Sequence, residues 1–251
     1  MSSTSLKVES PASHRTDKSS AGTAVDRTFE AHSTPLKTKA PSRQSMLASF
    51  NERAASWDSA PRRQALLLDI AQAIRSSVPL TKEWKVLDYG CGTGGLSFAL
   101  LPYVAEITAA DASSGMVAEA TRKKIALADH KESARLSTIQ LDLVESPPLN
   151  LKFDLIIACL VMHHIEHADQ VLGAFRSMLA PNGWIAIVEW GKPAANPTLA
   201  IKNRTSEEWA YALAREFVPG RIQCRAVHQF TRDDGSIAPA LLITAGPVPP
   251  Q

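Results

Sequence analysis

The stretch VLDYGCGTGG, residues 86–95, contains residue types that can hold a ligand at the end of a buried strand. Its glycines fit the dinucleotide pattern G-x-G-x-x-G starting at Gly90, and they also fit D-x-G-x-G-x-G starting at Asp88. Glycine at a strand-to-helix turn lets the backbone approach a ligand closely and adopt φ values that other residues avoid. Both patterns therefore indicate a cofactor site, and they differ in the cofactor.

Asp88 separates these two cofactors. In a dinucleotide site the helix N-terminus receives a pyrophosphate, and an ionised Asp88 would repel its oxygens. S-adenosylmethionine presents an ammonium and a sulfonium instead, which a carboxylate attracts. The residues therefore favour S-adenosylmethionine, with Asp88, Gly90 and Gly92 among the cofactor-binding positions and Cys91 as a small residue of the turn rather than a nucleophile.

Alternating strands and helices are expected to position this turn. Apolar runs predict strands, and stretches with apolar residues three or four apart predict helices. The predicted strands are 85–89, 106–110, 135–140, 153–158 and 184–189, and the predicted helices between them are 95–101, 114–128 and 170–179. This order predicts a doubly wound, mostly parallel α/β sheet.

The two ends of the domain have their own signals. Pro61, followed by apolar residues at helical spacing, predicts a helix before the first strand. Thr205 and Glu208 form a capping-box pattern, and residues 222–230 and 236–245 read as two extended stretches with Asp-Gly between them. We therefore expect a late helix and an antiparallel C-terminal hairpin.

Composition places limits on the function. Residues 1–45 hold seven Lys or Arg and four Asp or Glu, so the formal charge of +2 comes from this segment and the remainder is nearly neutral. That balance argues against nucleic acid as a partner, and no apolar run is long enough for a membrane span. We interpret residues 1–45 as a disordered tail rather than a transit peptide, and 46–251 as one domain. Three cysteines without C-x-x-C favour a reducing, cytoplasmic location.

Several motifs in order resemble one family. VLDYGCGTG, AADAS, QLDL, FDLIIACLVMHHI and LAPNGW, with FNERAASWD ahead of them, are similar to motifs of the class I S-adenosylmethionine-dependent methyltransferases, of the small-molecule methyltransferase domain 11/12 type. The resemblance covers roughly residue 50 to the C-terminus. It implies a Rossmann-like seven-stranded sheet with N-terminal lid helices, and methyl transfer from S-adenosylmethionine to a small molecule.

The resemblance assigns further cofactor-binding residues. Asp111, at the end of the second strand, would hold the ribose hydroxyls, although it could instead cap the next helix. Asp142 and the Leu143 backbone N–H would contact adenine, with a plain turn acid as the alternative for Asp142. Ala112, Met116 and Cys159 would line the cofactor, or else simply pack in the core. Trp57 in the lid would cover the cofactor, or else staple the next helix.

Histidines follow the fourth strand. Methyl transfer needs alignment and exclusion of water, and it needs a base only where the acceptor must lose a proton. His164, and secondarily His163, are the candidate bases; packing and loop hydrogen bonds are the alternative role. A metal site with Glu166 and His167 lacks the H-E-x-x-H spacing and is not expected.

Two other functions compete with methyl transfer. An NAD(P)-dependent oxidoreductase would need a Tyr-x-x-x-Lys pair after the fourth strand, which the sequence lacks there. A non-catalytic module that binds the cofactor and a protein partner is compatible with the same motifs. The residues do not select the acceptor atom, the oligomeric state or a protein partner.

Overall fold

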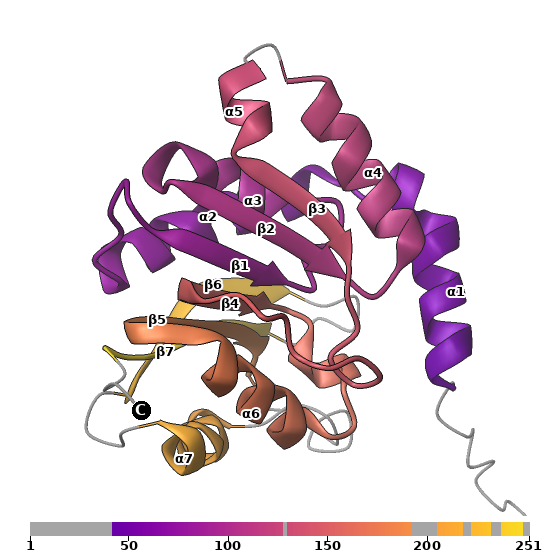
Figure 1. Cartoon of the computed structure of the whole chain (residues 1–251). Helices are drawn as coiled ribbons and strands as arrows, with labels where there is room; N and C mark the ends of the chain where they lie inside the picture. Colours follow the sequence, from indigo (N-terminus) through magenta and orange to yellow (C-terminus); the bar gives the residue numbers. More distant parts are fainter. Residues whose placement is uncertain (1–41, 128–129, 192–204, 218–221, 232–236, 248–251) are drawn as a thin grey trace, which may run out of the picture. The chain divides into compact units, whose positions relative to one another are not determined.

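Seven strands form one mixed sheet, in the order β3-β2-β1-β4-β5-β7-β6, in the computed structural model of the protein (Figure 1). The structure describes residues 42–127, 130–191, 205–217, 222–231 and 237–247. The strands are β1 (Lys85–Tyr89), β2 (Glu106–Asp111), β3 (Leu136–Gln140), β4 (Phe153–Cys159), β5 (Leu179–Trp190), β6 (Ile222–Thr231) and β7 (Ile237–Ala245). Neighbours among β1 to β5 pair in parallel, whereas β7 pairs antiparallel with both β5 and β6. This confirms the predicted doubly wound, mostly parallel α/β sheet with an antiparallel C-terminal hairpin.

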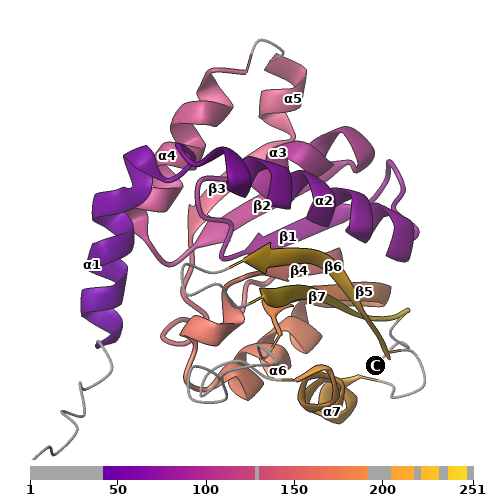
Figure 2. The same ribbon diagram turned by 180° about the vertical axis from the view of Figure 1, so that it is seen from behind.

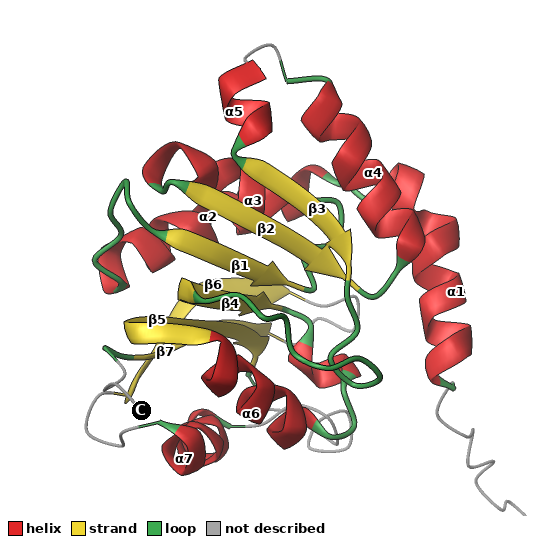
Figure 3. Ribbon diagram, viewed as in Figure 1, coloured by secondary structure: helices red, strands yellow, loops and turns green. Residues whose placement is uncertain are grey.

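Helices cover both faces of this sheet (Figures 2 and 3). They are α1 (Arg43–Arg53), α2 (Pro61–Ser77), α3 (Gly95–Leu100), α4 (Ser114–Ile125), α5 (His130–Ala134), α6 (Ala168–Met178) and α7 (Ser206–Glu216), with 3-10 turns at Ala54–Ser56, Leu101–Tyr103 and Met162–His164. Figure 1 shows α6 and α7 on the near face, and Figure 2 shows α2 on the opposite face.

The alternation of side chains along β1 explains why this strand is buried on both faces. Successive side chains of a strand point to opposite faces. Val86 packs in a cluster with residues of α2 and α3, whereas Leu87 and Tyr89 pack in a cluster with residues of α6 and α7. Asp88 shares the face of Val86 and is therefore directed toward α3.

The reversal in strand order lies beside β1, which pairs with β2 on one side and β4 on the other. In open α/β sheets the crevice for a ligand forms outside the carboxyl ends of the strands at such a switch point. The residues that follow β1, β2 and β4 are therefore placed around a common space.

The C-terminal signals were read correctly. Thr205 and Glu208 form the predicted capping box, with the Thr205 side chain accepting from the Glu208 N–H and the Glu208 carboxylate accepting from the Thr205 N–H. The hairpin strands β6 and β7 pair from Ile222↔Ala245 to Thr231↔Ile237. The predicted Asp-Gly turn between them lies outside the described residues.

Two boundaries differ from the prediction by three residues or more, and the others by one or two. Strand β5 begins at Leu179 instead of residue 184, because Pro181 to Gly183 form an irregularity inside the strand, and the pairing with β4 jumps from Phe153↔Leu179 to Leu155↔Trp184. Asn182 takes the left-handed φ of 61° that such a turn needs. Helix α4 ends at Ile125, before residue 128.

The compact unit that contains all described residues spans Pro41–Gln251, and its first helix begins at Arg43. Most of the tail expected at residues 1–45 lies outside the described residues. None of the described helices is both long and apolar enough to cross a membrane.

Candidate functional site

A cavity of about 430 Å³ opens at the carboxyl ends of β1, β2 and β4. Its lining includes residues from the glycine turn, the start of α4, the segment after β4, and the N-terminal segment formed by α1, the turn at Ala54–Ser56 and the start of α2. We call this N-terminal segment, residues 43–63, the lid. Most of the predicted site residues line this cavity: Trp57, Asp88, Gly90, Cys91, Gly92, Asp111, Ala112, Met116, Cys159, His163 and His164.

Asp88 lines this cavity and has one carboxylate oxygen without a hydrogen-bond partner among the described residues. Its side chain is 1% exposed, and its Oδ2 accepts a hydrogen bond of 2.6 Å from Ser97 Oγ on α3. Its Oδ1 is buried and finds no hydrogen-bond partner among the described residues. Burial, with a smaller contribution from the charge of Asp111, raises the pKa of Asp88 to about 6. A buried carboxylate oxygen without a donor is costly, so this position fits a ligand that brings a cationic donor.

The glycine turn is shaped by backbone conformation. Gly90 and Gly92 have φ values of 72° and 55°, and the Gly90 N–H donates to the Ala110 carbonyl at 2.7 Å. A Cβ at Gly90 would lie 2.4 Å from a Val161 methyl carbon. Glycine is therefore required at position 90 by both its φ and its close approach to the segment after β4.

Asp111 stabilises the same turn from β2. Its Oδ2 accepts from the Gly92 N–H and its Oδ1 from the Ser113 N–H, both at 2.8 Å. Burial raises the pKa of this carboxyl, and the two backbone donors oppose that rise. The cap of α4 is Ser113, whose Oγ accepts from the Met116 N–H. The alternative role of Asp111 as the cap of this helix is therefore wrong, and Asp111 lines the cavity.

The smaller lining residues offer apolar surface and little reactivity. Met116 is 2% exposed and lines the cavity together with Ala112. Burial raises the pKa of the Cys91 and Cys159 thiols well above their usual value. Both cysteines are therefore inert neutral thiols of the cavity wall.

The structure does not bring Asp142 and Leu143 into the cavity lining. The Leu143 N–H donates to Tyr89 Oη at 3.2 Å, and the expected contact of this N–H with adenine stays a prediction. The Asp142 carboxylate is ion-paired with Arg43 of the lid, and its Oδ1 accepts from the Val144 N–H at 3.0 Å. No local pattern in the sequence predicts that a lid residue pairs with this acid.

Polar contacts attach the lid to the loops around the cavity, and α1 itself buries no side chain. The Arg43–Asp142 ion pair is the first of these contacts. In the second, Asn51 Oδ1 accepts hydrogen bonds from Ser113 Oγ at 2.7 Å and from the Gly115 N–H in the first turn of α4 at 2.9 Å. The lid is therefore attached directly to the loop after β2.

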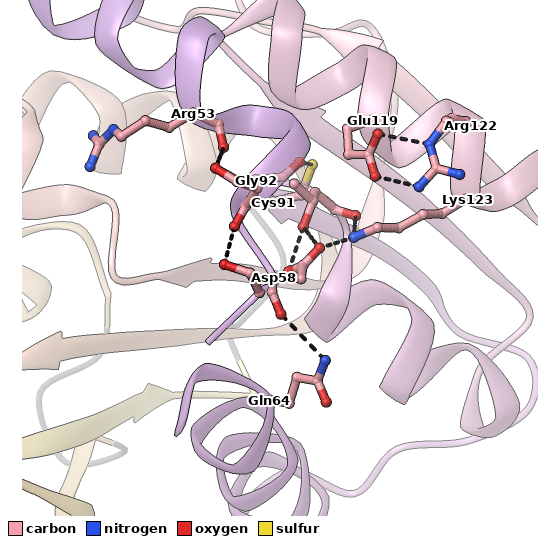
Figure 4. Close-up of polar contacts among 11 residues, drawn as sticks. Arg53, Asp58, Gln64, Cys91, Gly92, Glu119, Arg122 and Lys123 are labelled. Carbon is pink, nitrogen blue, oxygen red and sulfur yellow. Dashed lines mark hydrogen bonds and ion pairs between the residues drawn. The ribbon is translucent and has the colours of Figure 1, made fainter. Parts of the chain in front are cut away.

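Asp58 makes the third attachment, to the glycine turn. Thr93 Oγ1 lies 2.9 Å from both carboxylate oxygens of Asp58, and Lys123 Nζ contacts Asp58 Oδ2 and the Thr93 carbonyl (Figure 4). We call Asp58, Thr93 and Lys123 the latch. The residue before Asp58 is Trp57, whose Nε1 lies 3.6 Å from the position of a Cβ on Gly92. The latch thus holds the Trp57 indole against the glycine turn.

His163 is oriented by a carboxylate from the neighbouring strand. Its Nδ1 lies 2.7 Å from Glu189 Oε2 at the end of β5, and Glu189 is 1% exposed. Glu189 Oε1 also accepts from the backbone N–H of Met162 at 2.7 Å and of His163 at 3.3 Å. Because an ionised carboxylate only accepts hydrogen bonds, Nδ1 is the donor and Nε2 of the neutral ring is free to take a proton.

His164 has a different environment. Its ring packs edge-on against Phe50 of the lid at 5.2 Å and lies 3.9 Å from the His163 ring. Local sequence pattern did not predict that His163 pairs with Glu189. An acid at the end of the otherwise apolar strand WIAIVEW was the available signal. Within the described part of the chain, no group of His, Cys, Asp and Glu residues is arranged to hold a metal ion.

Comparisons with known proteins agree with this geometry. A family model described as a methyltransferase domain, type 12, matches residues 87–185. The chain is 31% identical over 130 residues to the hybrid PKS-NRPS synthetase lepA of Aspergillus flavus, which covers 49% of the chain and 3% of that protein. It is 32% identical over 116 residues to the malonyl-[acyl-carrier protein] O-methyltransferase of Enterobacter lignolyticus, which covers 46% of the chain and 43% of that protein. The chain thus spans less than half the length of these relatives.

Solved structures share the fold. Phosphoethanolamine N-methyltransferase 2 of Haemonchus contortus, in complex with S-adenosyl-L-methionine, superimposes with a TM-score of 0.58 at 16% identity, covering 73% of this chain and 52% of that one. The sheet order and the acid-glycine turn define a Rossmann-like methyltransferase fold. Together with the family model that matches residues 87–185, they support a class I S-adenosylmethionine-dependent methyltransferase.

Proposed function

We propose that the protein binds S-adenosylmethionine in the cavity and transfers its methyl group to a small-molecule acceptor. The observation that carries this proposal is that Asp88 lines the cavity while its buried Oδ1 has no hydrogen-bond donor among the described residues. The ammonium of the cofactor supplies that donor. A dinucleotide would instead bring anionic oxygens to an acidic wall formed by Asp88 and Asp111.

The cofactor-binding roles divide among the lining residues. Asp88 accepts from the amino group, and the lone pairs that Asp111 retains accept from the ribose hydroxyls. The open backbone at Gly90 and Gly92 lets the cofactor lie close to β1. Trp57 covers the glycine turn from the lid and excludes water. The bound cofactor supplies an electrophilic methyl group, and the residues of the chain align the acceptor with it.

We assign the general base to His163 rather than to His164. The Glu189 carboxylate fixes the His163 ring through Nδ1 and stabilises the imidazolium that forms when Nε2 takes a proton. His164 packs against Phe50 and serves the closed position of the lid. An acceptor atom that carries a proton before transfer, such as a hydroxyl, an amine or an acidic C–H, requires such a base.

Small molecules are the proposed acceptors for two reasons. The cavity that His163 and Trp190 line is also lined by residues of the lid, and the chain outside its first 45 residues carries nearly balanced charge. A basic face of the kind that binds nucleic acid is not expected from that balance. We place the protein in a reducing compartment, the cytoplasm, because its three cysteines form no framework.

A two-part experiment tests the function. Calorimetry with S-adenosylmethionine and with NADH on the purified chain should show binding of the first and none of the second. Incubation with a metabolite extract and labelled cofactor should then yield S-adenosylhomocysteine and a methylated product, and Glu189→Gln should suppress the product while the cofactor still binds. Tight cofactor binding without any methylated product would favour the non-catalytic module, and binding of NADH alone would favour an oxidoreductase.

A further inference from the structure

Leu160, the residue after β4, has an unusual backbone conformation. Its φ is 54°, in the left-handed region, where the side chain of an ordinary residue crowds the backbone and the conformation costs free energy. Among the described residues other than glycine, only Asn182 shares such a φ, and asparagine tolerates this region better than leucine does. The backbone conformation therefore does not explain why a leucine stands here.

The turn at Leu160 is needed for the geometry of the base. The Leu160 N–H donates to the Val188 carbonyl on β5 at 2.7 Å, so the residue is held by the sheet. Directly after the turn, the N–H groups of Met162 and His163 donate to Glu189. Glycine or asparagine would make the same turn with less strain. What leucine adds is its side chain.

The Leu160 side chain forms part of the cavity wall. Leu160 and Trp190, which ends β5, both line the cavity. Both also pack, partly buried, against the hydrophobic cluster that contains Val86 and residues of α2 and α3. Strained conformations persist where the surrounding structure enforces them, and they gather at functional sites. The strain at Leu160 thus accompanies an apolar side chain on the wall of the site.

The cavity wall at the ends of β4 and β5 lacks carboxylates, lysines and arginines among the described residues. The acids that line the cavity near the cofactor motifs, Asp88 and Asp111, belong to β1 and β2. A charged group that enters an apolar environment without a partner loses hydration at a high cost, whereas apolar surface gains from burial. The residues that form this wall are Cys159, Leu160, Val161, His163, His164, Ile165 and Trp190.

We propose that Leu160 and Trp190 form an apolar wall that selects a neutral, largely apolar acceptor. The inference rests on the proposed function, because it takes His163 as the base, and a base must lie within hydrogen-bond reach of the proton that it removes. The acceptor therefore meets the wall in which His163 stands. It gives its proton to His163 Nε2 and bonds to the methyl carbon as the bond from that carbon to the cofactor sulfur breaks. Leu160 sets specificity and is not a catalytic residue.

Binding of 2-naphthol and of 2-naphthoate tests the wall, because the two compounds share one ring system and only the second is charged at pH 7. Calorimetry titrates each compound into protein saturated with S-adenosylhomocysteine, which has no methyl group to transfer. The wild type should bind 2-naphthol at least about ten-fold more tightly than 2-naphthoate. Leu160→Asn should reduce this preference by about three- to ten-fold, through weaker binding of 2-naphthol alone.

Two further variants control for the substitution. Leu160→Met keeps an apolar side chain of similar volume and should keep most of the preference. Leu68→Asn makes the same chemical change on α2, where Leu68 is 63% exposed and is not part of the cavity wall. It should leave both affinities unchanged.

The wild type alone can overturn the proposal. Equal affinity for the two compounds, tighter binding of 2-naphthoate, or no binding of either would do so without any variant. Equal weakening of both compounds in Leu160→Asn would show that Leu160 only holds the turn, and an unchanged preference would show that its side chain does not set specificity. Failure of the wild type to bind S-adenosylhomocysteine or S-adenosylmethionine would instead contradict the proposed function.

Discussion

His163 Nδ1 and Glu189 Oε2 lie 2.7 Å apart, which joins the segment after β4 to the end of β5. The carboxylate also accepts from the Met162 and His163 N–H groups, so it orients both the ring and its backbone. The two residues therefore work as a unit, and the role of the histidine depends on an acid that is nearly inaccessible to solvent.

Glu189→Gln should reduce kcat by about a hundred-fold or more, because a glutamine amide can hold the ring in the wrong tautomer and cannot stabilise an imidazolium. The cofactor Kd should change less than about two-fold, since Glu189 touches the histidine and not the cofactor turn. Steady-state kinetics and calorimetry check the two quantities. His164→Asn serves as the comparison and should have the smaller effect on kcat; the reverse order would contradict the assignment of the base.

Asp88 should make the stability of the ligand-free protein depend on pH. Its pKa in the folded state is raised from 3.8 to about 6 by burial, so the folded state binds more protons than the unfolded state between these values. The free energy of unfolding should therefore fall as the pH rises from about 4 to about 6 and level off above that, by about 2 to 3 kcal/mol from this group.

Asp88→Asn removes this titration. The variant should lose that part of the pH slope and be at least as stable as the wild type at pH 7.5, while it binds S-adenosylmethionine more weakly. Denaturant unfolding at several pH values and calorimetry at pH 7.5 measure both effects. A variant that keeps the full slope would show that other groups produce it.

Loss of the latch should speed the release of the cofactor. Thr93→Val keeps the shape of the residue but removes the hydroxyl that Asp58 accepts from, and Asp58→Asn removes the charge that pairs with Lys123. Each should raise the cofactor dissociation rate by about three- to ten-fold, because partly buried polar pairs contribute on the order of 1 kcal/mol. Stopped-flow Trp fluorescence can follow the release.

Arg122→Met provides the control for the latch. Arg122 precedes Lys123 on α4 and pairs with Glu119 on the helix surface (Figure 4). Removal of this exposed pair should leave the dissociation rate unchanged. The double variant of Asp58 and Lys123 should release the cofactor no more than about two-fold faster than whichever of its two single variants releases it faster. Both single variants break the same network, so their effects should not add. Additive effects would argue against the latch.

Gly90→Ala should destabilise the protein by roughly 1 to 3 kcal/mol, because the residue has a φ of 72° and its new Cβ would lie 2.4 Å from Val161. Gly173→Ala on α6 is the matched control, since a Cβ there meets no heavy atom of a described residue within 4 Å. It should stabilise the protein by about 0.5 to 1 kcal/mol. Urea denaturation compares them, and a neutral Gly90→Ala would mean that the turn relaxes easily.

Local signals in the sequence were sufficient for most of the fold. β1 was predicted with its observed ends, because a short apolar run is closed there by the glycine turn. The capping box at Thr205 was equally readable, since both halves of the interaction lie within four residues. The start of β5 was misplaced, because Pro181 to Gly183 are turn residues that the sheet nevertheless accommodates as an irregularity.

Pairing between distant residues was the part that local pattern could not supply. The Asp142 carboxylate pairs with Arg43, and the hydrogen bond joins residues 99 positions apart. The Leu143 N–H donates to Tyr89, 54 positions away. A single sequence identifies these residues as polar groups at strand ends, but their partners depend on how the lid and the sheet meet in three dimensions.

The contact between Asn51 and the first turn of α4 links the position of the lid to the order of the loop after β2. If α1 swings away from α4, the Gly115 N–H and Ser113 Oγ lose their common acceptor, and the frayed first turn loosens the adjacent Ser113 N–H that holds Asp111. Movement of the lid would therefore disturb the same loop that holds the Asp111 carboxylate.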